Sequence, residues 1–325
     1  MKRLEADWLN APATRAVFAL LSDAGFAAYA VGGCVRNSLL GVPDKDIDLS
    51  TDARPETVMS LAQEAGLRTI PTGIDHGTVT VVSDGIPHEI TTYRRDIATD
   101  GRRAVVAFSD DITDDAMRRD FTMNALYADA GGAIVDPLGG LPDLQARRVR
   151  FIEDADQRSR EDYLRSLRFF RFNAWYGDPG QGFDPDALDA IARNVDGIAT
   201  LSQERLGGEM LRLLEAPDPV AAVAGMRSTG VLQAVLQGAD DRALGPLVHL
   251  ESVLQIAPDP IRRLSILGGT NVADRLRLSR QAADRLRVIS NGVAGSPRVS
   301  GYKLGKAHAI NVHLIEAATL GVPID

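Results

Sequence analysis

Two aspartates separated by one residue, Asp46 and Asp48, are the side chains of this chain best suited to hold a metal ion. If the segment "DKDIDLS" is a strand, residues two apart face the same side, so the two carboxylates lie together while Ile47 turns into the core. Like charges side by side are unfavourable unless a cation joins them. Carboxylate oxygens are the ligands that Mg²⁺ prefers, and such a pair can serve phosphoryl transfer. An Asp-x-Asp pair is common on its own, so the prediction of a Mg²⁺ site depends on its surroundings.

A glycine pair, Gly32 and Gly33, stands a short distance upstream in "VGGCVRNSLLG". It follows a predicted strand and precedes a predicted helix, so backbone N–H groups can approach an anionic ligand with no side chain in the way. Arg36, one helical turn further on, can add a charge-assisted contact to a phosphate. An isolated glycine pair can equally be an ordinary turn. Next to the aspartates, it predicts a triphosphate site.

Asp162 and Arg165 form a second candidate pair, three residues apart in the predicted long helix "SREDYLRSLRFFRFNAWYG". Residues at this spacing face one direction, and a carboxylate accepts hydrogen bonds where a guanidinium donates them. Cytosine and adenine offer an amine donor beside a ring-nitrogen acceptor, whereas guanine and uracil offer a carbonyl acceptor beside an N–H donor. The pair could therefore accept C and A and reject G and U without a template. The alternative is a plain salt bridge on a helix face.

The elements that must position these residues change in kind along the chain. The first half alternates helical stretches with short strands, including a strand before Gly32, the strand "DIDLST" and the hairpin "GTVTVVSDGIPHEITTYR". Glu89 lies on the second strand of that hairpin, with Ile90 as its inward neighbour. From Asp115 onward helical periodicity dominates, beginning with "DAMRRDFTMNALYADA". The pattern predicts an α+β head followed by an all-helical part.

Composition narrows the classes of protein. The net charge of -8 over 325 residues argues against a protein that coats nucleic acid by bulk attraction. Arginines nevertheless cluster locally, either for nucleotide binding or because a GC-rich genome prefers arginine codons. The single cysteine, Cys34, allows no internal disulfide, and no apolar run approaches the roughly 20 residues of a membrane span. We expect a cytoplasmic protein with no membrane and no disulfide partner.

Several blocks occur in an order that resembles a known family. They are "GGCVRNSLLG", "DKDIDLST", "HGTVTV", "EITTYRRD", "RRDFTMNAL", "DPLGGLPDL", "REDYLRSLRFFRF" and "LSQERLGGEMLRLL". Together they resemble the class II tRNA nucleotidyltransferase (CCA-adding enzyme) and bacterial poly(A) polymerase family, within the polymerase-β-like superfamily. The resemblance is strong over roughly residues 25 to 215 and weaker beyond. It implies a polymerase-β-like head of mixed sheet and helices, followed by an all-helical neck, body and tail.

The resemblance also implies the roles of residues. Asp46 and Asp48 would hold the metals, and Glu89 would be a third catalytic carboxylate or a solvated strand residue. The nucleotide-binding residues would be Gly32, Gly33, Arg36, Arg119, Asp120, Asn124, Asp162, Arg165, Arg168 and Arg171. "RRDFTMNAL" would place Asp120 and Asn124 on one helical face, and "EDYLR" would select the base. The family usually has Asp where this chain has Asn37, which keeps a hydrogen-bond acceptor but loses a charge.

The implied organisation is a catalytic head at residues 1–142, a neck for base recognition at 143–200, and a tRNA-binding body and tail at 201–325. The implied activity is template-independent addition of C, C and A to the 3′ end of tRNA from CTP and ATP, with Mg²⁺ and release of pyrophosphate. Within the family, addition of A or C alone and poly(A) synthesis are the alternatives. "GLRTIPTGIDHG" lacks the basic segment typical of poly(A) polymerases, and "RRDIATDGRRAVVAFSDD" supplies the flexible loop that A-adding enzymes typically lack. We therefore expect full CCA addition.

Two competing classes lie outside this activity. One is an inactive RNA-binding homologue, against which the intact Asp46, Asp48, Asp162 and Arg165 argue. The other is a nucleotidyltransferase for small molecules, against which "EDYLR" and the long helical half argue.

Overall fold

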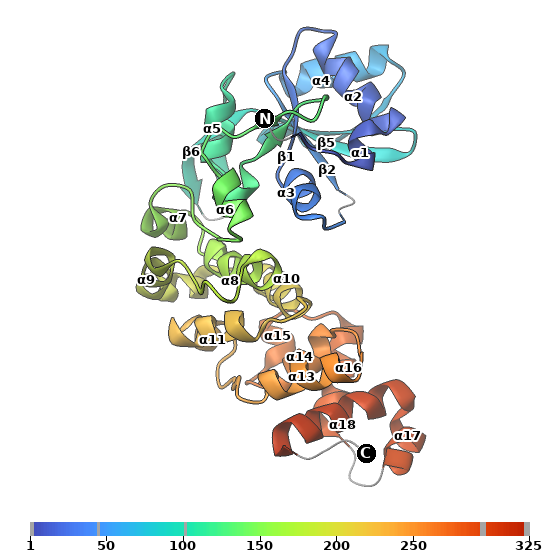
Figure 1. The fold of residues 1–325 in the computed structure, drawn as a ribbon, viewed down its shortest axis with the longest axis vertical. Coiled ribbons are helices and arrows are strands. Elements are labelled where there is room, and N and C mark those ends of the chain that lie inside the picture. Colours follow the sequence, from blue (N-terminus) through green and yellow to red (C-terminus); the bar gives the residue numbers. More distant parts are fainter. Residues whose placement is uncertain (1–2, 44–45, 101–102, 293–296, 322–325) are drawn as a thin grey trace. The chain divides into compact units, whose positions relative to one another are not determined.

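The computed structural model describes residues 3–43, 46–100, 103–292 and 297–321 (Figure 1). It divides into two compact units, Met1–Asp154 and Ala155–Asp325. Every described strand belongs to the first unit, and the described part of the second unit is helical. The predicted α+β class is therefore confirmed. The predicted head, residues 1–142, lies inside the first unit, and the finer division of the helical part stays a prediction.

A seven-stranded mixed sheet forms the centre of the first unit, with strand order β3-β4-β5-β2-β1-β8-β9. Its strands are β1 (Ala28–Val31), β2 (Ile47–Thr51), β3 (Arg68–Gly73), β4 (Thr78–Ser83), β5 (Ile86–Thr92), β8 (Tyr127–Ala128) and β9 (Ile134–Val135). Strands β2 and β5 pair in parallel and their neighbours pair antiparallel. The helices of this unit are α1 (Asp7–Asn10), α2 (Pro12–Ser22), α3 (Gly33–Leu40), α4 (Pro55–Glu64), α5 (Ile112–Met117) and α6 (Leu141–Gln145), with 3-10 turns at Ile74–His76 and Thr122–Asn124.

The two faces of the sheet differ in what they carry. Ile47 and Leu49 of β2 are buried, as are Val79 and Val81 of β4, on the face that α2 and α4 cover. On the same face, the buried His88 of β5 forms a hydrogen bond with Thr14 of α2 at 3.1 Å. Because strand residues alternate, Asp48 and Ser50 lie on the opposite face. The core on that opposite face includes Val31, Tyr127 and the α5 residue Ala116.

The segment expected as a flexible loop after the hairpin forms a separate two-stranded sheet instead. Strands β6 (Arg94–Asp100) and β7 (Arg103–Phe108) pair antiparallel with a register shift between Asp96 and Ala98. Valine and phenylalanine in "AVVAF" suit a strand, whereas the loop expectation rested on the glycine and the charges of the segment. The flexibility of the segment stays a prediction.

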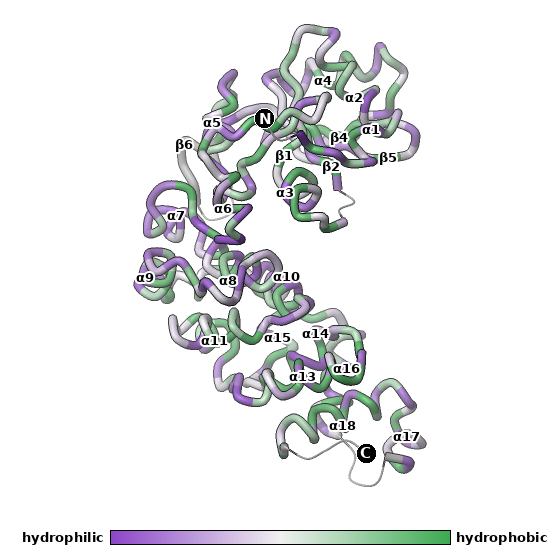
Figure 2. Tube along the Cα trace, in the orientation of Figure 1, coloured by the Kyte–Doolittle hydropathy of each residue, from purple (hydrophilic) through white to green (hydrophobic). Residues whose placement is uncertain are grey.

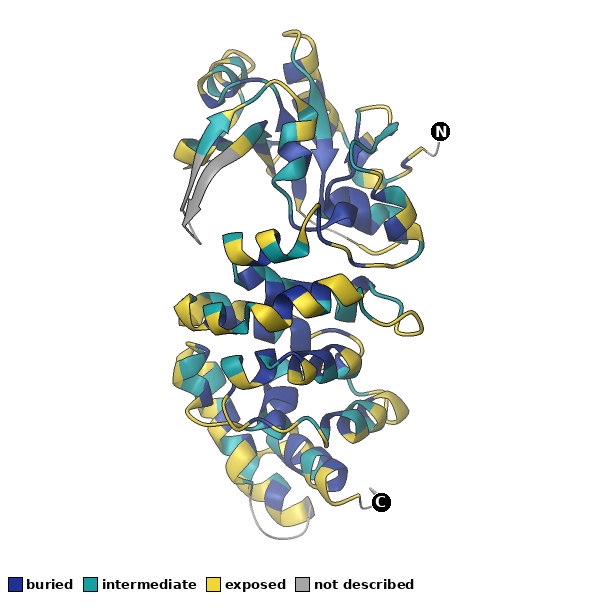
Figure 3. Ribbon diagram, turned by 90° about the vertical axis from the view of Figure 1, so that its left-hand side faces the viewer, coloured by how far each residue is buried: buried dark blue, intermediate teal, exposed yellow. Residues whose placement is uncertain are grey.

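The second unit contains the helices α7 (Ala155–Glu161), α8 (Leu164–Tyr176), α9 (Pro185–Arg193), α10 (Gln203–Leu214), α11 (Val220–Ser228), α12 (Val231–Val235), α13 (Leu244–Val253), α14 (Pro260–Leu267), α15 (Val272–Arg275), α16 (Arg280–Asn291), α17 (Pro297–Leu304) and α18 (Lys306–Leu320), with a 3-10 helix at Val195–Thr200. Hydrophilic and hydrophobic residues alternate along these helices (Figure 2), and buried and exposed faces alternate with them (Figure 3). None of the described helices combines the length and hydropathy that a membrane crossing requires.

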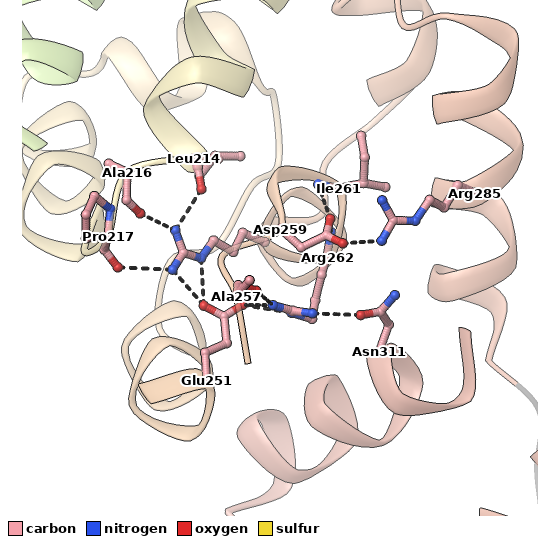
Figure 4. Close-up of polar contacts among 11 residues, drawn as sticks. Leu214, Ala216, Pro217, Glu251, Ala257, Asp259, Ile261, Arg262, Arg285 and Asn311 are labelled. Atoms are coloured by element: carbon pink, nitrogen blue, oxygen red, sulfur yellow. Dashed lines mark hydrogen bonds and ion pairs between the residues drawn. The ribbon is translucent and has the colours of Figure 1, made fainter. Parts of the chain in front are cut away.

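A buried ionic cluster joins four helices of the second unit (Figure 4). Glu251 of α13 accepts hydrogen bonds from Arg262 and Arg263 of α14, and all three residues are buried. Arg262 also donates to Asn311 Oδ1 of α18 at 2.8 Å. Arg263 further donates to the carbonyl oxygens of Leu214, Ala216 and Pro217, at and just beyond the end of α10. The Arg263 side chain of α14 thus supplies hydrogen-bond donors to backbone carbonyl groups that α10 leaves unpaired at its C-terminal end.

Candidate active site

Strands β2 and β5 bring two of the three predicted catalytic carboxylates, Asp48 and Glu89, to one face of the sheet. Asp46 immediately precedes β2 and is exposed, and Asp48 within β2 is partly buried. In the parallel register Asp48 lies opposite Glu89 of β5, whose side chain is exposed. Ile90, the residue after Glu89 in β5, is buried, as the sequence predicted for the inward neighbour of Glu89.

The carboxylate pair fits a divalent metal better than the full triad does. Among the described residues, no group of three or more His, Cys, Asp or Glu side chains is close enough to hold a metal ion. Asp46 and Asp48 are hard oxygen donors at the solvent-accessible end of a strand. Mg²⁺ is commonly held by one or two carboxylates, with water and substrate phosphate as its other ligands. A metal site at the two aspartates and a catalytic part for Glu89 both stay predictions.

The glycine pair forms the turn between β1 and α3. Gly32 has φ of 75°, in the left-handed region where a side chain is strained, and it caps the N-terminus of α3. A Cβ on Gly32 would also stand 3.3 Å from Nη1 of Arg119. The Gly32 N–H donates to the Leu126 carbonyl at 3.3 Å, so the candidate donors for an anion are the N–H groups of the first turn of α3, starting at Gly33.

A chain of hydrogen bonds connects Arg36 to the "RRDFTMNAL" block. The buried Arg36 donates from Nε to Asn37 Oδ1 at 2.9 Å and from Nη1 to Asn124 Oδ1. Asn124 in turn donates from Nδ2 to Asp120 Oδ1 at 2.8 Å. The structure therefore brings together predicted residues that lie 88 positions apart in the sequence. Asn37 takes part as an acceptor, the property that it shares with aspartate.

The sequence predicted one continuous helix through the "RRDFTMNAL" block, and this prediction is wrong. Helix α5 ends at Met117, and the 3-10 turn Thr122–Asn124 follows after a short break. At the break, Phe121 forms a β-bridge with Phe151 and stacks on it with ring centroids 5.1 Å apart. This distant contact overrides the local helical period. Asp120 and Asn124 meet through a hydrogen bond, not as neighbours on one helical face.

Asp115, which the sequence analysis did not single out, is the most constrained carboxylate of this region. It is fully buried and accepts hydrogen bonds from Arg118 at 2.6 Å, Arg119 at 3.0 Å, Tyr127 at 2.8 Å and Ser50 at 3.1 Å. Burial alone would raise the pKa of the Asp115 carboxyl, but the guanidinium groups of Arg119 and Arg118 hold that pKa well below its usual range. The adjacent pair Arg118 and Arg119 was the available signal in the sequence, but several aspartates precede it and nothing local distinguishes Asp115 among them.

In the second unit, Asp162 and Arg165 do not share one helix as predicted. The long helix is interrupted at Asp162 and Tyr163, which separate α7 from α8. The Asp162 side chain accepts the Leu164 N–H at 3.1 Å and so supports the start of α8. Its other oxygen accepts a hydrogen bond from Arg205 of α10 at 2.6 Å. Arg165 donates from Nη1 to Glu161 at 2.5 Å and to the Arg158 carbonyl at 3.1 Å.

The other two predicted arginines of α8 contact a buried carboxylate. Arg171 donates from Nε to Glu209 Oε2 of α10 at 2.6 Å, and Arg168 lies 3.7 Å from Glu209 Oε1. Both guanidinium groups also lie over the ring of Phe172. Glu209 is buried, so the pairing holds α8 against α10. A nucleotide-binding part for Arg168 and Arg171 stays a prediction beside this packing role.

Comparison with known proteins defines the class of both units. A family model described as "Poly A polymerase head domain" matches residues 28–150, which include the whole glycine turn and both aspartates. A second, "Probable RNA and SrmB- binding site of polymerase A", matches residues 182–242. The mixed sheet with paired aspartates beside a glycine turn is therefore a nucleotidyltransferase head. The chain belongs to the family of CCA-adding enzymes and poly(A) polymerases.

The individual proteins that this chain resembles carry names from the same family. The human mitochondrial CCA tRNA nucleotidyltransferase 1 is 44% identical over 184 residues, which cover 56% of this chain and 42% of that protein. The CCA-adding enzyme of Geobacillus stearothermophilus is 41% identical over 224 residues, covering 67% and 52%. The crystal structure of the Bacillus stearothermophilus CCA-adding enzyme in complex with CTP superposes with a TM-score of 0.74 at 30% identity, covering 96% and 78%. The matches thus span about half the length of these two curated relatives.

Proposed function

We propose that this protein adds C, C and A to the 3′ end of tRNA, using CTP and ATP and releasing pyrophosphate. The observation that carries the proposal is the placement of Asp48 on the face of the sheet where Ser50 contacts Arg119, with Gly32 beside that arginine and Asp46 immediately before the strand. The names of the relatives, CCA-adding enzyme and CCA tRNA nucleotidyltransferase, support the choice of reaction and of tRNA. A cytoplasmic location is part of the proposal.

In the proposed reaction, the RNA 3′-hydroxyl attacks the α-phosphate of the nucleotide. Asp46 and Asp48 would hold Mg²⁺, which stabilises the attacking and leaving oxygens. The first turn of α3 and the guanidinium groups of Arg36 and Arg119 would bind the triphosphate, because donors fixed beforehand lose little entropy on binding. The Asn37 and Asn124 amides would keep Arg36 oriented without adding a negative charge against the triphosphate.

Base selection is assigned to Asp162 and Arg165 of the second unit. Within the described part of the chain, each oxygen of Asp162 accepts one hydrogen bond, and a carboxylate oxygen can accept two. Arg165 makes its side-chain hydrogen bonds to described residues through Nη1, so Nε and Nη2 would be the donors to a base. A cytosine or adenine edge would therefore meet an acceptor and a donor. Residues 143–200 would serve this step and residues 201–325 would bind tRNA, for which the match to an RNA-binding family model is support.

The test supplies the purified chain with Mg²⁺, labelled CTP, ATP, GTP or UTP, and tRNA transcripts ending before CCA, after C and after CC. We expect addition of C, C and A only. The Asp46→Ala variant should lose incorporation, whereas Asp23→Ala, which removes an exposed carboxylate at the end of α2, should retain it. Addition of A alone or C alone would identify a partial enzyme, and long A tails on unrelated RNA would identify a poly(A) polymerase. No incorporation with retained tRNA binding would leave an RNA-binding homologue.

A further inference from the structure

Arg119 lies beside the glycine turn, and several contacts hold its side chain there. Its Nη2 contacts Asp115 at 3.0 Å and Ser50 Oγ at 3.4 Å, and its Nε donates to the Tyr127 hydroxyl at 3.3 Å. The guanidinium carbon also lies 5.5 Å from the centre of the Tyr127 ring. Nη1 is the atom that a Cβ on Gly32 would meet at 3.3 Å. The guanidinium group therefore has one edge against protein acceptors and another beside the turn.

Asp115 contacts both hydroxyl groups that lie against this arginine. Its Oδ2 accepts from Arg119, from the Tyr127 hydroxyl and from the Ser50 hydroxyl. Ser50 and Tyr127 are fully buried, so these acceptors and donors have little freedom to move. Without Asp115, the Tyr127 and Ser50 hydroxyl groups would lose their common acceptor and Arg119 would lose its charged partner. Asp115 thus contacts Arg119 directly and also holds the two hydroxyl groups that lie against it.

The register of β2 relates this cluster to the metal aspartates. Ser50 is two residues beyond Asp48, so both side chains leave the strand on the same face. The Asp115 cluster is attached to that face through the Ser50 hydroxyl, about 6.6 Å along the strand from Asp48. The contacts of Arg119 are therefore built on the same strand that carries the metal aspartates.

The charges of the cluster favour an anion beside Gly32. One carboxylate, Asp115, is shared by two guanidinium groups, those of Arg118 and Arg119. The three side chains together keep a net positive charge, and Arg118 and Arg119 retain some solvent exposure, at 16% and 17% of their side chains. A phosphate that approaches the turn would meet a guanidinium edge in a fixed direction, which is the geometry that arginine uses for phosphate recognition.

We propose that Asp115 is a positioning residue for the incoming nucleotide: it holds Arg119 beside Gly32 so that the guanidinium group binds the triphosphate. The proposal rests on the proposed function for the identity of the ligand. Asp115 itself does not touch the nucleotide. It acts through Arg119, and its removal should weaken nucleotide binding more than it slows the chemical step.

The first experiment compares Asp115→Asn with the wild type in tRNA extension, measuring KM and kcat for CTP and ATP. We expect KM to rise about tenfold, as removal of a residue that orients a binding side chain commonly does, with kcat much less affected. The matched control is Asp143→Asn. Asp143 is another buried carboxylate of the first unit that pairs with two arginines, Arg148 and Arg150, and this variant should leave KM unchanged.

A double-mutant cycle separates positioning from a general structural role. Arg119→Lys keeps the charge but loses the planar fork that Asp115 orients. If Asp115 acts through Arg119, Asp115→Asn should raise KM far less in the Arg119→Lys background than in the wild type. Equal effects in both backgrounds, or an unchanged KM in the folded Asp115→Asn variant, would overturn the proposal.

Two further measurements test the proposal if Asp115→Asn does not fold or if the wild type is inactive. If Asp115→Asn does not fold, Tyr127→Phe removes one acceptor of Arg119 without removing a charge, and an unchanged KM in that variant would count against the proposal. If the wild type incorporates no nucleotide, the proposed function fails, and calorimetric binding of CTP with Mg²⁺ then tests the positioning alone. Weaker binding by Asp115→Asn than by Asp143→Asn would support it, whereas equal or undetectable binding in all three proteins would refute it.

Discussion

The buried His88 makes the stability of the core between the sheet and α2 depend on pH. Its side chain is fully buried between β5 and α2, where Nδ1 contacts the Ile86 carbonyl and Nε2 contacts the Thr14 hydroxyl. Burial lowers the pKa of His88 below its usual value, against the opposing effect of the backbone hydrogen bonds. The neighbouring Glu89 faces the other side of the strand, so this histidine stabilises the sheet and is not part of the catalytic face.

Acidification should therefore destabilise the first unit through His88. Between the usual histidine pKa of about 6.5 and the lower pKa in the folded state, the unfolded chain binds more protons than the folded chain. The free energy of unfolding should thus fall as pH decreases through the usual histidine pKa toward the lower pKa of the folded state, by about 1.4 kcal/mol per unit of pKa shift. Urea unfolding of the wild type and of His88→Gln measures this. The variant should show the shallower dependence on pH, and identical slopes would contradict the assignment.

At the scale of single elements, α10 contains two adjacent glycines with opposite surroundings. A Cβ on Gly207 would stand 1.9 Å from the Leu276 carbonyl oxygen at the end of α15, whereas a Cβ on Gly208 would meet nothing within 4 Å. Gly207 therefore permits close approach of two segments, and Gly208 only adds flexibility to the helix.

The two alanine variants should consequently shift stability in opposite directions. Gly208→Ala should raise the free energy of unfolding by about 0.5 to 1 kcal/mol, because alanine is the better helix former. Gly207→Ala should lower it by about 1 to 3 kcal/mol, because the backbone must move to admit the methyl group. Thermal and urea unfolding of both variants gives the sign directly. Stabilisation by Gly207→Ala would mean that α10 and α15 are not packed as described.

The same scale shows what the sequence could and could not predict. The glycine turn, the strand of Asp46 and Asp48, and the hairpin strand of Glu89 were predictable because each is encoded in a short contiguous pattern. The unbroken helix through Asp162 was wrong, because hydrophobic period cannot show that an aspartate side chain accepts the Leu164 N–H and restarts the helix. Contacts between distant residues were equally invisible.

Asp115 and Asp120 illustrate that second limit. Asp115 could not be chosen among many aspartates because its partner Ser50 lies 65 residues earlier in the chain. The break before Asn124 depends on the pairing of Phe121 with Phe151, which no local window contains. Of the candidate site, the sequence therefore supplied the residues that would touch the ligand, and the structure added the residue that orients one of them.

At the scale of the whole molecule, the two compact units should unfold separately enough to be distinguished. The chain has two tryptophans, Trp8 in the first unit and Trp175 in the second. Trp8 donates to Ser38 and Trp175 donates to the Arg212 carbonyl, so each reports on contacts within its own unit. Single-tryptophan variants therefore follow each unit by fluorescence.

Glu251→Gln should lower the stability of the second unit alone. The substitution leaves Arg262 and Arg263 buried without their common carboxylate, a loss that typically costs about 3 to 5 kcal/mol. Trp175 fluorescence should report unfolding at lower urea, while Trp8 fluorescence should report an unchanged transition. Asp240→Asn, which breaks the exposed pair with Arg242 in the same unit, is the control and should shift neither. Equal shifts at both tryptophans would show that the two units unfold together.

The bonds from Arg263 to the end of α10 also bear on how the chain folds during synthesis. The Leu214 carbonyl receives its side-chain donor only when a residue 49 positions later has been made. The first unit ends at Asp154 and is compact through contacts within its own residues, so it can fold as it leaves the ribosome. The end of α10 must wait for α14. A ribosome that pauses between these two helices would therefore hold a finished catalytic head joined to an unfinished second unit, which is the nascent state most in need of a chaperone.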